Sequence, residues 1–313
     1  MPLTTKILAL LLAVPPAVAA AAGTARPAGE KLKIIATVLP LAEFARDIAG
    51  DRGEVSLLLP PGADVHTWQP RIGDIRKLEA ASLLLSVGQG LEPWLESLVK
   101  GTDAGKLARF TASEGMPLLR GGEEEREEAE HAGHAHGGFD PHLWLDFGLD
   151  AVIADGLAAV LSRLDPEGSE IYVRNAAGLK TRLAALDASY RAVLGKYAGR
   201  KIFIGGHAAF SYLARRYGLV QVAVYGLSPD AAPSPREIAS VIEQARREGV
   251  TTVFYEPGTG DRIARMLAAE IGADVRLLHP GHNLDPGPTR AEKTFFRLME
   301  ENLESLKHGL AGR

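Results

Sequence analysis

The middle of the sequence contains a long helical stretch, residues 167–197, which reads EGSEIYVRNAAGLKTRLAALDASYRAVLGKY. Its apolar residues recur in alternating steps of four and three, which is the spacing of one face of an α-helix. These residues are Tyr172, Ala176, Leu179, Leu183, Leu186, Tyr190, Val193 and Tyr197. Asp165-Pro166 provides a helix start signal and Gly199 a stop signal. A helix of this length spans roughly 45 Å, which is about the length of a whole domain.

Two interpretations of this helix are possible. Its spacing also fits a heptad repeat, so it could be a coiled-coil arm that forms a dimer. However, it holds only about four heptads, and alternating strand and helix patterns lie on both sides of it. We therefore favour a linker helix, residues 166–198, that joins two lobes of one chain, and we expect a monomer.

The composition is that of a globular protein with enough residues for two domains. The chain has 313 residues, of which 46% are hydrophobic and 24% charged, and its formal net charge is −4. No basic cluster is present, so nucleic acid is not expected as a partner. The sequence has no cysteine. Any bound metal ion would therefore need histidine and carboxylate ligands.

Residues 1–22 are typical of a signal peptide. Lys6 precedes the apolar run Ile7–Val14, and the small residues Ala17–Ala22 suit signal peptidase, with cleavage near residues 20–23. The apolar run is too short for a permanent membrane anchor, and no cysteine is present to carry a lipid. We expect a secreted protein of a bacterial periplasm.

The two flanking regions have the alternating pattern of parallel sheets covered by helices. In the N-terminal lobe, residues 31–165, strands are expected at 33–38, 55–59 and 82–87, and helices at 41–48, 72–80, 92–99 and, as a short helix, up to about 164. In the C-terminal lobe, residues 199–313, strands are expected at 201–204, 220–224, 252–255 and 275–278, and helices at 207–217, 237–247, 261–271 and 291–308. The predicted fold class is α/β, with two doubly wound parallel-sheet lobes joined by one long rigid helix. No convincing internal sequence repeat accompanies it.

Three histidines stand where strands or Gly/Pro breaks lead into loops. His66 follows the Pro60-Pro61-Gly62 break, His142 follows Pro141, and His207 follows Gly206. Doubly wound sheets bind ligands beyond the carboxyl ends of their strands, so these histidines could meet on that side. A single histidine in such a loop is more often a hydrogen-bonded structural residue. The residues alone leave a metal site and a structural role equally open.

Four segments occur in an order that resembles one known family. They are Asp64–Trp68 (DVHTW), Asp140–Asp146 (DPHLWLD), Gly206–Leu213 (GHAAFSYL) and Leu284–Pro286 (LDP). An acidic, histidine-rich stretch, residues 121–138, lies between the first two. The sequence thus resembles the zinc- and manganese-binding solute-binding proteins of metal ABC transporters, from about Lys33 to Leu310, with the stretch typical of the zinc members.

The resemblance implies a ligand set of His66, His142, His207 and Asp285. Manganese relatives place a glutamate at the position that matches His207. Three imidazoles and one carboxylate suit tetrahedral Zn²⁺, whereas Mn²⁺ prefers more oxygen ligands, so Zn²⁺ is the expected cargo. Asp285 follows a segment that is longer than expected for the family, so His282, His279 or water remain alternatives for the fourth position.

Further residues carry weaker expectations. His131, His134 and His136 lie in the histidine-rich loop, and their clustering favours weak, transient capture of zinc over a merely solvated acidic tract. Glu256 matches a family position that is usually structural, and it could orient a ligating histidine from behind. Asp146 could also support the site, but capping of the next helix is at least as plausible.

The function implied by the resemblance is high-affinity capture of Zn²⁺ in the periplasm and delivery to an ABC-type permease of the inner membrane. A periplasmic zinc chaperone is a further candidate partner. A zinc-dependent hydrolase is an alternative, but the sequence has no H-E-x-x-H, nucleophile elbow or P-loop, and four protein ligands would close the metal site. We therefore do not expect an enzyme. A surface adhesin of the same fold is a second alternative.

Overall fold

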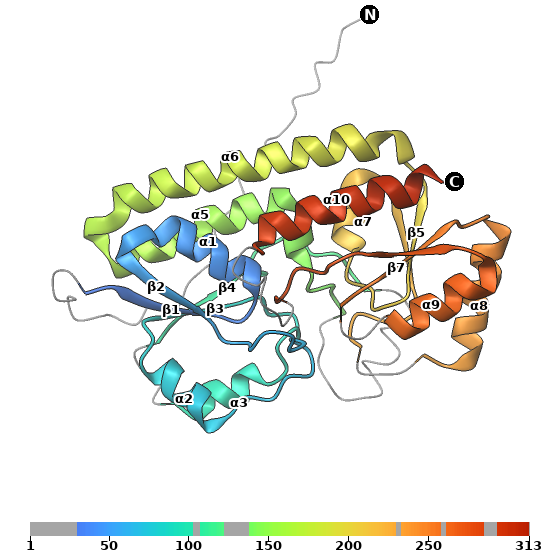
Figure 1. Cartoon of the computed structure of the whole chain (residues 1–313). Coiled ribbons are helices and arrows are strands. Elements are labelled where there is room, and N and C mark those ends of the chain that lie inside the picture. The colour runs from blue at the N-terminus through green and yellow to red at the C-terminus, as the bar shows by residue number, and fades with distance from the viewer. Residues whose placement is uncertain are drawn as a thin grey trace, which may run out of the picture.

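The computed structural model describes residues 30–102, 107–121, 138–229, 233–257, 261–284 and 293–312. The expected signal peptide, the loop histidines His131, His134 and His136, and Asp285 lie outside these ranges. The described chain forms two lobes, each built on a four-stranded parallel sheet, and a long helix runs past both of them (Figure 1). Within the described ranges, no helix is long and apolar enough to cross a membrane.

The first sheet has the strand order β2-β1-β3-β4. Its strands are β1 Leu32–Ala36, β2 Gly53–Leu57, β3 Leu83–Ser86 and β4 Ala108–Thr111. Its helices are α1 Leu39–Ala49, α2 Ile72–Glu79 and α3 Leu95–Lys100, with a 3₁₀ turn at Gly50–Arg52. Sequence analysis missed β4, because this four-residue strand alternates buried and half-buried positions and has no continuous apolar run.

The second sheet has the equivalent order, β6-β5-β7-β8. Its strands are β5 Lys201–Ile204, β6 Val220–Ala223, β7 Thr252–Tyr255 and β8 Asp274–Leu277. Its helices are α7 Ser211–Tyr217, α8 Pro235–Arg247, α9 Asp261–Ile271 and α10 Phe295–Ala311. The two lobes therefore repeat one topology although their sequences show no repeat. The helix expected from residue 207 begins at Ser211 instead, which leaves His207 in a loop.

The segment between the lobes is helical almost throughout. It contains a 3₁₀ turn at Leu143–Leu145, α5 Phe147–Leu164, a 3₁₀ turn at Pro166–Gly168, α6 Ser169–Leu194 and a 3₁₀ turn at Gly195–Tyr197. Helix α6 and the 3₁₀ turns on either side of it together cover the predicted helix. The helix that ends at Leu164 was expected to be short, but α5 has 18 residues.

The apolar face of α6 is buried within this chain. Helices α5, α1 and α10 cover it. The buried residues are Tyr172, Ala176, Leu179, Leu183, Leu186, Tyr190 and Leu194. Leu194 replaces the predicted Val193 because the last buried step from Tyr190 is four residues rather than three. Since helices of the same chain cover the heptad-like face, that face does not form a coiled-coil arm.

Polar contacts fix both ends of α6. Near its start, Arg52 donates two hydrogen bonds to Asp165, at 2.6 and 2.8 Å, and the Tyr172 hydroxyl donates to the same carboxylate. Near its end, the Tyr190 hydroxyl donates to the Met299 carbonyl of α10 at 2.6 Å. The helix is therefore anchored to the first lobe at one end and to α10 at the other.

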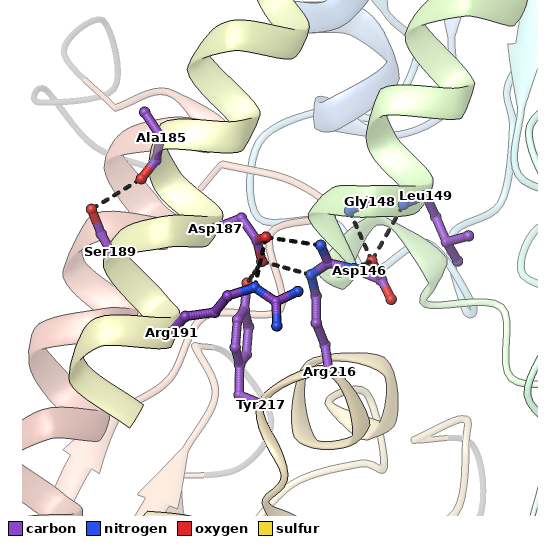
Figure 2. Close-up of polar contacts among 9 residues, drawn as sticks. All are labelled: Asp146, Gly148, Leu149, Ala185, Asp187, Ser189, Arg191, Arg216 and Tyr217. Carbon is purple, nitrogen blue, oxygen red and sulfur yellow. Dashed lines mark hydrogen bonds and ion pairs between the residues drawn. The ribbon is translucent and has the colours of Figure 1, made fainter. Parts of the chain in front are cut away.

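A network around Asp187 joins α6 to the second lobe (Figure 2). Arg216 of α7 donates to both Asp187 oxygens, at 2.7 and 3.0 Å, and its third nitrogen contacts Asp146 at 2.5 Å. Tyr217 and Arg191 also donate to Asp187, at 2.8 and 3.0 Å. Asp146 in turn caps α5, so Arg216 connects α5, α6 and α7.

We predict that Asp187→Asn lowers the free energy of unfolding at pH 7 by about 1–3 kcal/mol, because the change removes charge-assisted hydrogen bonds. Burial alone would raise the pKa of Asp187, but hydrogen bonds from Arg216, Tyr217 and Arg191 outweigh burial and lower it to about 2. The unfolded value is about 3.9. The carboxylate therefore stabilises the fold above about pH 4, and this contribution is lost as the pH falls toward 2.

Urea unfolding at several pH values between 7 and 3 measures this effect. The matched control is Asp155→Asn, since Asp155 is 60% exposed and pairs with Lys180 of the same helix α6. The control should change stability by less than about 0.5 kcal/mol. A loss for Asp187→Asn that stays constant down to pH 3, or no loss at all, would contradict the prediction.

Candidate metal site

The structure brings together the three histidines that the sequence singled out. His66 lies in the loop between β2 and α2, His142 lies just before the 3₁₀ turn at Leu143–Leu145, and His207 lies between β5 and α7. One nitrogen from each ring falls within 4.8 Å of the other two. His142 Nε2 and His207 Nε2 lie 3.2 Å apart. All three side chains are buried. Because His66 and His142 precede α6 and His207 follows it, the group lies where the two lobes meet.

The His66 loop is held by its own aspartate and by a tryptophan pair. The Asp64 carboxylate accepts the His66 backbone N–H at 2.8 Å. Trp94 Nε1 donates to the Val65 carbonyl at 2.8 Å, and the Trp94 ring packs edge-on against Trp68, with centroids 4.6 Å apart. These contacts fix the backbone on both sides of His66.

His142 is oriented by Asp140. One oxygen of Asp140 accepts the His142 backbone N–H at 2.9 Å and lies 2.8 Å from His142 Nδ1. Asp140 also closes the base of the histidine-rich insertion, because its N–H donates to the Leu119 carbonyl at 2.8 Å. Gly121 and Gly138 form the next pair of this base. The insertion therefore leaves the fold directly beside the residue that orients His142.

His207 is oriented by Glu256 in the same way, although Glu256 comes from the end of β7. One oxygen of Glu256 accepts the His207 backbone N–H at 2.7 Å, and the other lies 2.7 Å from His207 Nδ1. Gly206 makes this approach possible, since a Cβ at Gly206 would lie 1.9 Å from the Glu256 carboxylate oxygen. The structure thus places Glu256 behind the ring of His207.

Each of these two rings thus has a carboxylate at Nδ1 and turns Nε2 toward the other ring. A carboxylate at Nδ1 holds the ring proton there and leaves the Nε2 lone pair free for a cation. Burial by itself would lower the pKa of His207, but the charge and hydrogen bond of Glu256 outweigh burial and raise it, with smaller effects from Asp64 and Asp140. The three histidines therefore lie close to carboxylates whose negative charge favours a cation at this site.

The spacing of the nitrogens also suits a tetrahedral ion. Zinc–nitrogen bonds of about 2.0–2.1 Å in a tetrahedron place two nitrogens about 3.3–3.4 Å apart. The observed separation of 3.2 Å between the Nε2 atoms of His142 and His207 is close to that value. A cation between the two rings could therefore accept both Nε2 lone pairs.

Three other candidate residues, His279, His282 and Asp146, are not members of this ligand group in the described part of the chain. Among the described residues, the group consists of the three histidines, and neither His279 nor His282 belongs to it. His279 Nδ1 accepts the Gly281 N–H at 2.9 Å, and His282 Nε2 lies 3.9 Å from Asp64. Asp146 caps α5 and pairs with Arg216, so these contacts of its carboxylate are with helices rather than with the imidazoles.

Asp140 is the residue that sequence analysis did not single out. Its signal is local, because an aspartate two residues before another residue often accepts that residue's backbone N–H. The Asp64–His66 and Asp140–His142 pairs both show this pattern. Only the structure reveals that Asp140 also reaches the ring of His142.

Comparisons with known proteins agree with the fold and with the resemblance. The family model for ZnuA, the periplasmic component A of zinc-uptake complexes, matches residues 34–309. The high-affinity zinc uptake system protein ZnuA of Bacillus subtilis is 34% identical over 292 residues, which cover 92% of this chain and 90% of that protein. The zinc-binding lipoprotein AdcA of Streptococcus pneumoniae is 34% identical over 284 residues, which cover 90% of this chain but only 56% of AdcA.

The chain therefore spans just over half the length of AdcA. The crystal structure of the Zn(II)-bound ZnuA-like domain of Streptococcus pneumoniae AdcA superposes with a TM-score of 0.73 at 31% identity, covering 90% of this chain and 99% of that domain. This similarity confirms the α/β architecture of two lobes and a long helix. The extent of the family match and the level of identity show that the chain belongs to the ZnuA family of periplasmic zinc-uptake components.

Proposed function

We propose that this protein captures one Zn²⁺ ion between its lobes, in the periplasm, and delivers it to an ABC-type permease of the inner membrane for import. The observation that carries the proposal is the buried group of His66, His142 and His207, whose ligand atoms lie within 4.8 Å of one another. Carboxylates behind two of the rings add support, because they are typical of histidines that ligate zinc. Membership of a zinc-uptake family points to the same cargo.

Asp285 is our proposed fourth ligand. It comes directly after Leu284, the last described residue of its segment. Three imidazoles and one carboxylate would give a closed tetrahedral site, which suits a carrier, whereas a hydrolase needs an open metal position. Mn²⁺ is disfavoured because it prefers more oxygen ligands.

Other parts of the proposal concern the rest of the chain. We propose that residues 1–22 are a signal peptide, that residues 31–165 and 199–313 act as the two metal-binding lobes, and that His131, His134 and His136 capture zinc weakly before it reaches the main site. A periplasmic zinc chaperone is a further proposed partner. The adhesin alternative has no support from the geometry of the described residues.

Calorimetric titration of metal-free protein with Zn²⁺ tests the proposal. Residues 122–137 should be removed so that only the main site is measured, and the hydrogen-bonded Gly121 and Gly138 offer a short join. We predict one tight equimolar site that is lost in His207→Ala. The control is His308→Ala, because the His308 side chain is 55% exposed and lies on α10. The proposal would be wrong if the shortened protein has no tight equimolar site, or if His207→Ala keeps it.

We also predict that Asp140→Asn and Glu256→Gln each weaken zinc binding about 10–100-fold, since each change removes the charge that orients an imidazole. Competition with a chromophoric chelator measures the affinities. The control is Glu270→Gln, a change in a 56% exposed carboxylate that pairs with Arg246 in the same lobe as Glu256. If both site variants bind zinc as tightly as the control, the carboxylates do not support the site.

A further inference from the structure

The segment that follows β8, residues 279–284, crosses from the second lobe to the first, and we call it the crossover strap. Its start is held by α10, because the Asn302 side chain accepts the His279 N–H and donates to the His279 carbonyl, both at 2.7 Å. Its remaining residues make hydrogen bonds to other segments of the chain, and Gly281 and Leu284 also donate to side chains within the strap. The strap therefore bridges the lobes on the side where the histidines meet.

Backbone groups of the strap are bonded to three separate segments. Trp144 Nε1 donates to the Pro280 carbonyl at 2.8 Å. The Leu39 N–H donates to the His282 carbonyl, and the Gly62 N–H donates to the Leu284 carbonyl, both at 2.8 Å. Two of these contacts are made beside metal-site loops, since Trp144 follows His142 and Gly62 precedes His66.

Asn283 makes the side-chain contact between the strap and the His66 loop. Its Nδ2 donates to the Pro60 carbonyl at 2.7 Å and to the Ala63 carbonyl at 2.9 Å. Its Oδ1 accepts the Leu284 N–H at 2.8 Å, so both ends of the amide are used. The side chain is almost fully buried, which strengthens these bonds. Because both partners across the lobes are carbonyl oxygens, the contact requires a donor at this position.

This contact matters because the histidine group is enclosed. His66, His142 and His207 are at most 5% exposed, so an ion can reach or leave them only if nearby segments move. Helix α6 and its polar anchors oppose a wide separation of the lobes. Opening of the site should then cost the least free energy where the His66 loop of the first lobe contacts the strap. The Asn283 amide makes this contact.

We propose that Asn283 is the latch that sets how fast zinc enters and leaves the site, a role that rests on the proposed function. The Asn283 amide is hydrogen-bonded to backbone groups of Pro60, Ala63 and Leu284 rather than to the histidine rings. A contact that is equally strong with and without the ion cannot shift the binding equilibrium. Loss of the latch should therefore accelerate binding and release together and leave the dissociation constant nearly unchanged.

The test measures zinc release and uptake by stopped flow in the full chain, using a chelator to trap released zinc and a fluorescent competitor to follow uptake. We expect Asn283→Ala to raise both rates about tenfold, as for the loss of one to two hydrogen bonds. The dissociation constant should stay within about threefold of wild type. Asn283→Asp should raise the rates at least as much, because it places an oxygen against two carbonyls.

The matched control is Asn175→Ala, which removes a similar side-chain hydrogen bond, from Nδ2 to the Ile48 carbonyl at 3.0 Å. Asn175 lies near the N-terminal end of α6. Its rates of zinc uptake and release should equal those of wild type. Thermal unfolding of both metal-free variants shows whether a change in these rates follows from a change in overall stability. The inference would be overturned if Asn283→Ala releases zinc at the wild-type rate. It would also be overturned if release alone accelerates and affinity falls in proportion, because Asn283 would then be positioning a ligand. If wild type itself binds no zinc, the proposed function fails instead.

Discussion

The whole site depends on how the proton of an imidazole is placed. A neutral imidazole carries its proton on one nitrogen, and only the other nitrogen can bind a cation. In two of the three histidines a carboxylate stands at Nδ1, so Nε2 is the nitrogen that points inward. The two carboxylates, Asp140 and Glu256, also bind the backbone N–H of the same histidines. Ring orientation and backbone position are thereby fixed by one group in each lobe.

The rest of the fold serves to bring these two pre-oriented rings and His66 together. Two sheets of equivalent strand order each present loops on their ligand side, and α6 sets the distance between them. The anchors at Asp165, Asp187 and Tyr190 attach this helix to both lobes. We therefore expect movement during metal exchange to be confined to loops, among them the crossover strap and the His66 loop that it contacts.

Much of this arrangement could be predicted from the sequence. The apolar spacing gave the position of α6 because its buried face is continuous, and the Pro-Pro-Gly break predicted a loop at His66. His207 was expected at the start of a helix, but that helix begins at Ser211 and leaves His207 in a loop. Strand β4 was missed because its four residues, which alternate between buried and half-buried, are too few to give a clear periodic signal. The partnership of Glu256 with His207 joins residues 49 positions apart. Such a contact depends on strand order and on the absence of a side chain at Gly206, and neither is visible in local patterns.

The central claim is that one ion is held jointly by ligands from both lobes. Anomalous X-ray scattering at the zinc edge, from crystals of the zinc-loaded protein, tests this claim most directly. Our account predicts a single strong peak within about 2.0–2.1 Å of one ring nitrogen from each of His66, His142 and His207. A strong peak bound by residues of one lobe alone, or a peak away from this group with none beside it, would contradict the account.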